Sequence, residues 1–245
     1  MLRVSERNAT HAQVNRPLVR EFGHVLARLD WHVALLQEAP PRWLAPLCRA
    51  TGASGALALT SRNLLPGVRA ALARRNPDVM ASNEGGSNQL LVRMPWRIEE
   101  VRRHTMARRP ERRRMLFGRL AGPHGIPLAV ANVHASTGDG AATAAEVVAA
   151  AERAVEWSAA APMVFGGDLN LRPEREPRAY AELQSRLGLS APVDARAIDH
   201  LLARGLVPVD GPRALAPEVR EVGDGEGRAI RLSDHPLVAG TFEVE

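Results

Sequence analysis

The chain has 245 residues, of which 45% are hydrophobic and 24% charged, as in ordinary globular proteins and unlike disordered or fibrous ones. All 32 basic side chains are arginine, and the absence of lysine excludes chemistry that needs a Schiff-base lysine or a P-loop lysine. The net charge of +5 is compatible with an anionic partner, but arginine richness can also reflect the coding bias of a genome.

Length and apolar runs bear on domain number and location. A chain of this size without a long polar linker predicts one domain over residues 1–245. The first residues lack the apolar stretch of a secretory signal, and no run approaches the roughly 20 apolar residues that span a bilayer. We therefore expect a cytoplasmic protein without a membrane span, and the sequence gives no sign of an obligate protein partner.

Hydrophobic periodicity predicts a mixture of helices and strands. Apolar residues at helical spacing indicate helices, and short apolar runs between turn residues indicate strands. In chain order we expect a helix over 13–29, a strand over 31–36, a helix over 41–50, irregular chain over 62–78, a turn over 83–87, strands over 89–93, 115–120 and 126–133, a helix over 141–161, a strand over 163–165, a helix over 177–187, and strands over 197–202 and 237–244. Because these elements do not follow a strict βαβ repeat, they predict a mixed α/β sheet protein.

Polar side chains lie at the ends of the apolar runs. Each such junction alone is most often a turn or a cap, but several in one chain supply carboxylates, imidazoles and amides together. In sequence order the junctions are Asn8, Gln37-Glu38, Asn132-Val133-His134, Gly166-Gly167-Asp168-Leu169-Asn170, Ile198-Asp199-His200 and Ser233-Asp234-His235.

With these motifs the sequence resembles the endonuclease/exonuclease/phosphatase superfamily, which includes the DNase I-like nucleases. The resemblance follows the family's order through nearly the whole chain and is most specific at Gly-Asp-Leu-Asn (167–170) and Ser-Asp-His (233–235). It implies a four-layer α/β/β/α sandwich, in which two packed mixed β-sheets are flanked by helices. It also implies a divalent-metal-dependent phosphoesterase.

The resemblance further implies how the metal is held. Glu38 would be the main ligand of Mg²⁺ or Mn²⁺, with Asn8 and Asp234 as supporting oxygen ligands. This assignment agrees with the chemistry of a hard cation, which prefers oxygen ligands and keeps several waters.

The remaining polar residues would act on the ester. By resemblance, Asp168 would orient or deprotonate the attacking water, and Asn170 would position the water or the phosphate. His235, held by Asp199, would donate to a phosphate oxygen or transfer a proton. His134 would contact the substrate and stabilise or protonate the leaving group.

Other histidines and the arginine-rich stretch have weaker settings. His200 follows Asp199 directly, so on a strand its side chain is expected to point away from the site. Surface or packing positions are expected for His11, His24, His32, His104 and His124. The stretch from Arg102 to Arg114 is the densest charge cluster, and it could attract a polyanion or form a solvated loop before a strand.

The substrate stays open at this level. A phosphodiesterase acting on nucleic acid fits the basic balance of the chain and His134. A phosphatase or phosphodiesterase for a small or lipid-linked ester is the second hypothesis. The third is a binding module that kept the fold and lost catalysis, and it ranks last because the catalytic residue types are all present.

Overall fold

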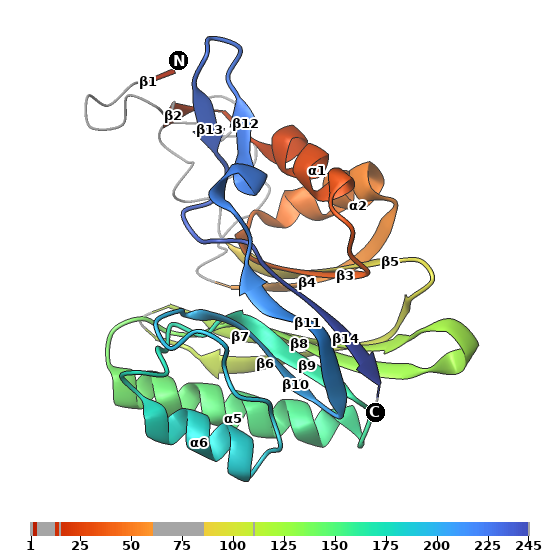
Figure 1. The fold of residues 1–245 in the computed structure, drawn as a ribbon, viewed down its shortest axis with the longest axis vertical. Helices are drawn as coiled ribbons and strands as arrows, with labels where there is room; N and C mark the ends of the chain where they lie inside the picture. Colours follow the sequence, from red (N-terminus) through yellow and green to blue (C-terminus); the bar gives the residue numbers. More distant parts are fainter. Residues whose placement is uncertain (1, 4–12, 15, 61–85, 110, 245) are drawn as a thin grey trace.

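A computed structural model describes residues 2–3, 13–14, 16–60, 86–109 and 111–244 of the chain. Two β-sheets pack face to face and helices cover both outer faces, so the predicted α/β/β/α sandwich is confirmed (Figure 1). The main elements are β1 (Leu2–Arg3), β2 (Gln13–Val14), α1 (Val19–Arg28), β3 (Val33–Ala39), α2 (Leu44–Thr51), β4 (Ala53–Leu59), β5 (Ser87–Arg93), β6 (Arg97–Ala107), β7 (Arg113–Ala121), β8 (Pro127–His134), α5 (Gly140–Ser158), β9 (Met163–Asp168), α6 (Pro177–Ser185), β10 (Asp199–Arg204), β11 (Leu206–Ala214), β12 (Glu221–Gly223), β13 (Ala229–Arg231) and β14 (Val238–Val244).

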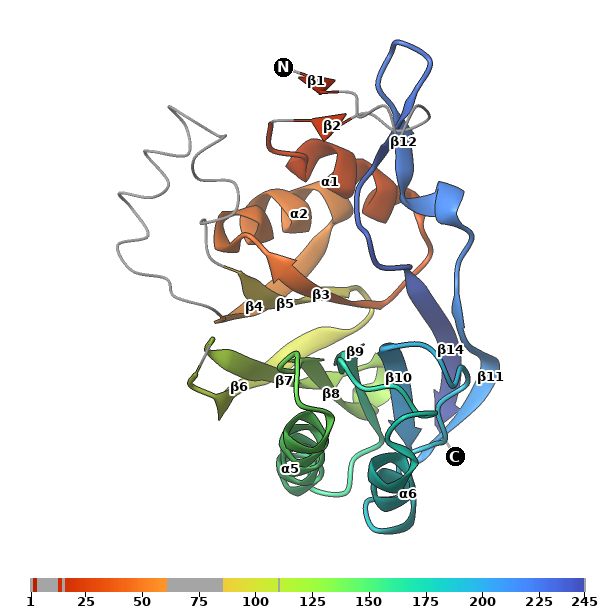
Figure 2. The same ribbon diagram turned by 90° about the vertical axis from the view of Figure 1, so that its left-hand side faces the viewer.

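Each large sheet carries its own pair of helices. The smaller sheet has the strand order β3-β5-β4, and α1 and α2 lie on its outer face (Figure 2). The larger sheet has the order β10-β9-β8-β7-β6, with α5 and α6 on its outer face. Within the larger sheet β8 and β9 are parallel, because α5 carries the chain back between them, and the other neighbouring strands are antiparallel.

Strand β5 shows why the layers stack in this order. Leu90 packs into the cluster between the two sheets, whereas Leu91 faces the cluster under α1 and α2. Successive residues of a strand point to opposite faces, so an apolar run is what a strand buried on both sides requires. The sandwich therefore follows from continuous apolar runs such as Leu90 to Val92, which place apolar side chains on both faces of the strand.

The helix predicted over 13–29 is wrong in its first third. Gln13 and Val14 instead pair with β1, and α1 begins at Val19, two residues after Pro17. A proline restrains the residue before it to extended conformations, which delays the start of the helix. The expectations for residues 62–78 and 83–85 lie outside the described residues.

The arginine-rich stretch is largely strand, so its interpretation as a solvated loop is wrong. Most of it belongs to the antiparallel pair β6 and β7, and only a short connection separates Ala107 from Arg113. Strand β6 is the edge of the larger sheet, where charged side chains are common because they oppose edge-to-edge aggregation. Strand β6 gives little period-2 signal, because its few apolar residues do not alternate and its register shifts at Ile98/Glu100 and Thr105/Ala107.

One arginine joins the helices of the first layer to their sheet. The Arg93 guanidinium donates hydrogen bonds to the carbonyls of Leu26, Leu29 and Thr51 at 2.8–3.0 Å, and it lies 3.9 Å from the ring centroid of Trp31. The last carbonyls of a helix have no intrahelical donor, so a planar fork of N–H groups satisfies several at once.

No helix within the described ranges is long and apolar enough to cross a membrane.

The two sheets are tied together by Asn132, which is fully buried on the inner face of β8. Its amide nitrogen donates to the carbonyls of Leu36 and Gln89 at 3.0 and 2.8 Å, and its amide oxygen accepts from Gln37 Nε2 at 2.7 Å. One side chain of the larger sheet thus bonds with both β3 and β5 of the smaller sheet. Because every polar atom of the amide is paired, its burial carries little desolvation penalty.

We predict that Asn132→Ala lowers the free energy of unfolding by about 3 kcal/mol, since it leaves buried partners unsatisfied. Asn88→Ala is the matched control, because Asn88 is equally buried but donates a single hydrogen bond, to the Arg114 carbonyl. Urea unfolding followed by circular dichroism measures both. Equal losses in the two variants would contradict the role assigned to Asn132.

Candidate functional site

Three of the predicted site residues lie side by side across the larger sheet. His134 ends β8, Asp168 ends β9 and Asp199 begins β10. In the register of the sheet, Asp168 pairs with His134 on one side and with Asp199 on the other. Neighbouring strands are about 4.8 Å apart, so this register alone gathers an imidazole and two carboxylates into one row.

The two glycines before Asp168 make this close pairing feasible. A Cβ on Gly167 would lie 2.1 Å from the Val133 carbonyl oxygen, and Gly167 has a φ of +121° that side chains rarely adopt. A Cβ on Gly166 would lie 2.5 Å from the His200 carbonyl oxygen. Gly-Gly-Asp at the end of β9 is therefore a packing requirement as well as a turn signal.

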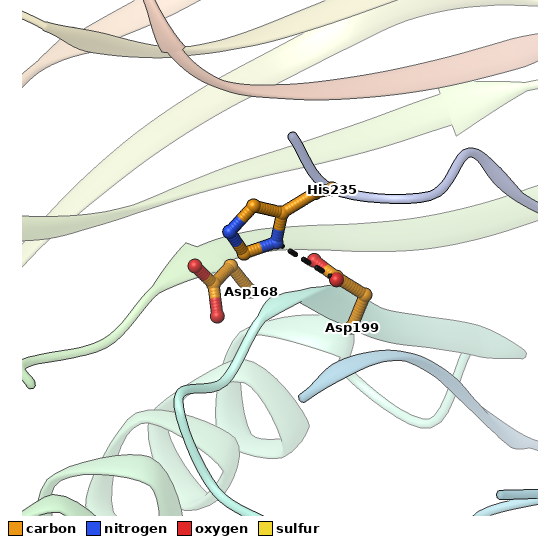
Figure 3. A group of neighbouring side chains, drawn as sticks. All are labelled: Asp168, Asp199 and His235. Carbon is orange, nitrogen blue, oxygen red and sulfur yellow. Dashed lines mark hydrogen bonds and ion pairs between the residues drawn. The ribbon is translucent and has the colours of Figure 1, made fainter. Parts of the chain in front are cut away.

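His235 reaches this row from the loop before β14 (Figure 3). Its Nδ1 lies 2.9 Å from Asp199 Oδ2, which accepts the hydrogen bond. Asp168, Asp199 and His235 each offer a ligand atom, and these atoms lie within 4.8 Å of one another, a spacing that could hold a metal ion. Burial lowers the pKa of His235, but the hydrogen bond from the ring to Asp199 and the nearby carboxylates outweigh it, so the pKa is raised overall.

Asn170 fixes the carboxylate of Asp168. It has a positive φ of 48°, a conformation that asparagine tolerates, and its backbone N–H donates to Asp168 Oδ1 at 2.9 Å. The Asn170 amide donates to the carbonyl of Ala135 at 3.0 Å. Asp168 is 7% exposed, and burial raises its pKa to about 6, against the opposing effect of the Asn170 hydrogen bond.

Glu38 approaches the row from the other sheet. It lies at the end of β3 with a positive φ of 55°, and its Oε1 is 3.9 Å from His134 Nε2. Its side chain is 75% exposed, and within the described part of the chain it accepts no hydrogen bond. A carboxylate placed at a site in this way has its oxygens available to a cation.

His134 has a cation beside it that the sequence did not point out. Arg113 Nη1 lies 2.9 Å from both ring nitrogens, so the guanidinium can donate to the nitrogen without a proton. His134 Nε2 is 3.6 Å from Asp168 Oδ2. Burial, followed by the charge of Arg113, lowers the pKa of His134 to about 3, so the imidazole is neutral at physiological pH.

The structure thus brings together most of the predicted set. Asp234 is exposed beside His235, and its charge contributes to the pKa of both Asp199 and His235. Asn8 lies outside the described residues. His200 is buried on the opposite face of β10, where its ring packs against Tyr180, 5.4 Å between centroids, as its place beside Asp199 predicts. The predicted residues that gather here are Glu38, His134, Asp168, Asn170, Asp199, Asp234 and His235.

The sequence analysis missed Arg113 beside the site, and it named Asn132 as part of a strand-end junction without giving it a role. Arg113 was one of a run of arginines, and nothing in that run distinguishes it. Asn132 stands two residues before His134, so period-2 alternation places both side chains on one face of β8, and this signal could have revealed its inward position.

Comparison with protein-family models gives a match over most of the chain. A model of the Endonuclease/Exonuclease/phosphatase family matches residues 13–235. The chain belongs to the endonuclease/exonuclease/phosphatase family. A search of curated proteins gives no significant match.

Several solved structures share the fold. An endonuclease/exonuclease/phosphatase family protein from Bacteroides thetaiotaomicron has a TM-score of 0.67 at 13% identity, covering 91% of this chain and 88% of its own. A mannosyl-6-phosphatase from the same organism has a TM-score of 0.66 at 13% identity, covering 92% and 90%. TDP2 from D. rerio, in complex with a single-strand DNA product, has a TM-score of 0.60 at 17% identity, covering 92% and 91%.

The raised pKa of Asp168 predicts that its ionisation opposes folding. Because the folded state binds the proton more tightly than the unfolded chain, stability falls as pH rises from about 4 through about 6. In EDTA at pH 7, we expect Asp168→Asn to be more stable than the wild type by on the order of 2 kcal/mol.

Thermal unfolding between pH 3.5 and 8 measures this effect. The difference should vanish near pH 3.5, where the carboxyl is protonated in both states. The exposed Asp30→Asn is the control and should change little throughout. A variant of Asp168 that is less stable than the wild type at pH 7 would disprove the assignment.

Proposed function

We propose that the protein is a divalent-metal-dependent phosphoesterase that hydrolyses a phosphodiester by in-line attack of a water oriented by Asp168. The observation that carries this proposal is the row His134, Asp168 and Asp199, with His235 hydrogen-bonded to Asp199 at 2.9 Å. Membership of the endonuclease/exonuclease/phosphatase family supports hydrolysis of a phosphate ester as the reaction class.

Asp168 is proposed as the group that positions the water and takes its proton. A pKa of about 6 leaves the carboxyl mostly ionised at neutral pH but makes it a better base than an exposed aspartate. The hydrogen bond from Asn170 N–H holds one oxygen, which leaves the other to face the substrate. Asn170 is proposed to position the phosphate or the water beside this carboxylate.

His235 is proposed to act as the cation that faces the phosphate. The Asp199 carboxylate accepts from Nδ1, so the Nε2–H is free to donate to a non-bridging oxygen or to give up its proton. The raised pKa keeps the imidazole charged to a higher pH than in free histidine. A charge placed in advance at the site stabilises the negative charge that develops in the transition state.

His134 is proposed to stabilise the leaving oxygen rather than to protonate it. With a pKa of about 3, the ring is neutral at physiological pH and has no acidic imidazolium proton to transfer. The nitrogen that does carry one can still donate a hydrogen bond, while Arg113 occupies the other nitrogen. Of the two roles that the sequence left open for His134, stabilising or protonating the leaving group, this arrangement supports the first.

Glu38 and Asp234 are proposed to hold the divalent ion, Mg²⁺ or Mn²⁺, together with Asn8. The donor set fits a hard cation, because Glu38 and Asp234 are exposed carboxylates at the rim of the site. By contrast, Asp199 already accepts a hydrogen bond from His235. A bound divalent cation would neutralise phosphate charge and act as a Lewis acid.

Hydrolysis of plasmid DNA, RNA, bis-p-nitrophenyl phosphate and p-nitrophenyl phosphate tests the proposal. We expect turnover of the diesters with Mg²⁺ or Mn²⁺ and none in EDTA, because the phosphate charge is then not neutralised. Asp168→Ala and His235→Ala should each reduce turnover by at least about 100-fold. Preference for p-nitrophenyl phosphate would instead favour a monoesterase, and a folded protein inactive on all four would favour a binding module.

Glu38→Gln and Asp199→Asn should separate metal binding from the chemical step. Isothermal titration of Mg²⁺ should show affinity lowered at least about 10-fold in Glu38→Gln, which removes a charged ligand, and little change in Asp199→Asn. Both variants should have lower, still measurable activity. The control is Glu156→Gln on α5, whose carboxylate is also exposed. Loss of Mg²⁺ affinity only in Asp199→Asn would place the ion among Asp168, Asp199 and His235.

The pH dependence of kcat/KM should be bell-shaped. Activity should rise through about pH 6 as Asp168 ionises and fall at higher pH as His235 loses its proton. Removing the Asp199 charge takes away an effect that raises the pKa of His235, so Asp199→Asn should move the alkaline limb to lower pH. An alkaline limb that stays in place would show that another group controls it.

A further inference from the structure

Glu38 lies in a β-bulge at the end of β3. The pairing of β3 with β5 shifts register between Leu36 and Ala39. Two residues of β3, Gln37 and Glu38, thereby oppose one residue of β5, Asn88. A bulge of this kind redirects a side chain out of the regular alternation of its strand. Because Glu38 has a φ of +55°, which is unfavourable for a residue with a Cβ, the surrounding structure has to maintain this conformation.

The segment that follows the bulge has few backbone donors. The two residues after Ala39 are prolines, which have no N–H to donate to β5. Two side chains of β5 bond to this segment instead. The Ser87 hydroxyl donates to the Ala39 carbonyl at 2.7 Å. Gln89 Nε2 donates to the Pro40 carbonyl at 2.9 Å. Side-chain hydrogen bonds thus hold the two residues that come directly after Glu38.

The contacts of Ser87 and Gln89 are enclosed and support one another. Both side chains are fully buried, and Gln89 Nε2 also donates to Ser87 Oγ at 3.1 Å. A Cβ on Gly86 would lie 3.4 Å from the Cα of Glu38 and 3.0 Å from Thr60 Oγ1, so this end of β5 packs directly against the bulge. Hydrogen bonds are stronger in the low dielectric of a protein interior than in water. Ser87 and Gln89 therefore constrain the backbone beside Glu38 from inside the core.

We propose that Ser87 and Gln89 are positioning residues, whose hydrogen bonds to the chain after the bulge hold the Glu38 carboxylate where it binds the divalent ion. On the other side of the bulge Gln37 donates to Asn132, so the backbone of Glu38 is fixed from both directions. Groups that orient a metal ligand without contacting the metal raise its affinity. The inference rests on the proposed function, in which Glu38 is a ligand, and it adds two residues to that site.

Isothermal titration of Mg²⁺ into the protein, without substrate, tests the proposal. Ser87→Ala removes the hydroxyl donor, and Gln89→Met removes the amide donor with little change in size. We expect each variant to bind Mg²⁺ about 10-fold more weakly than the wild type, because the Glu38 backbone is then less constrained. Unchanged affinity in both variants would overturn the proposal.

Ser158→Ala is the matched control for Ser87→Ala. Ser158 is also fully buried, and its hydroxyl donates to a carbonyl, that of Val155 on α5, at 2.8 Å. Thermal unfolding in EDTA measures the stability that each variant loses, whereas the affinity for Mg²⁺ should fall only in Ser87→Ala. An equal fall in Ser158→Ala would show that loosened packing accounts for the effect, and it would overturn the proposal.

A double-mutant cycle tests whether Ser87 acts through Glu38. In the Glu38→Gln background, Ser87→Ala should change the affinity for Mg²⁺ by less than about 2-fold, because the charged ligand that Ser87 positions is no longer there. A purely structural role would give the same loss in both backgrounds. An undiminished loss in Glu38→Gln would therefore overturn the positioning role.

The titration separates this inference from the proposed function, because it contains no ester. If no substrate is hydrolysed but Mg²⁺ affinity depends on Ser87 through Glu38, the phosphoesterase function fails while the positioning role stands. If metal-dependent hydrolysis is observed but Glu38→Gln binds Mg²⁺ as the wild type does, the function stands and the positioning role is overturned.

Discussion

The hydrogen bonds of Asn132 between the two sheets are the constraint on which the site depends. An apolar interface fixes the separation of two sheets but lets them slide, since dispersion and burial have little direction. A buried amide that pairs with Leu36, Gln89 and Gln37 has direction, and it sets β8 against β3 and β5 in a single register. Glu38 is the residue after Gln37 on β3, and His134 lies two residues after Asn132 on β8. The same hydrogen bonds therefore hold the backbones of Glu38 and His134 near one another.

The charge states of Asp168, His134 and His235 differ because the three side chains are buried to different extents. Asp168 and His134 are both enclosed, and each is pushed toward its neutral form, whereas His235 is more exposed and keeps its charge through Asp199. The pKa values of the two histidines, which are equal in water, are thereby moved apart. The base, the neutral donor and the cation of the proposed hydrolysis can then coexist at one pH.

Local patterns allowed most strands and helices and the polar strand-end junctions to be predicted, whereas the four layers and the roles of the site residues were implied by the resemblance to the family. Strand-end motifs such as Gly-Asp-Leu-Asn name their residues directly, and runs such as Met163 to Phe165 need no long-range information. Strand β6 escaped detection because two register shifts along it break the alternation of apolar and polar residues, and its arginines are as common in loops. Arg113 and Asn132 could not be assigned partners, since those partners lie 21 residues away in one case and 43 to 96 in the other.

The row formed by His134, Asp168 and Asp199 exists only when β8, β9 and β10 pair in the native register. A slip of one residue between β8 and β9 would turn every side chain of the slipped strand to the opposite face, so Asp168 would leave the row even if the two backbones still paired. Such a misfolded form would look native by helix and strand content. Specific activity would then measure the fraction of molecules with correct pairing, a property that bulk spectroscopy of the backbone cannot distinguish.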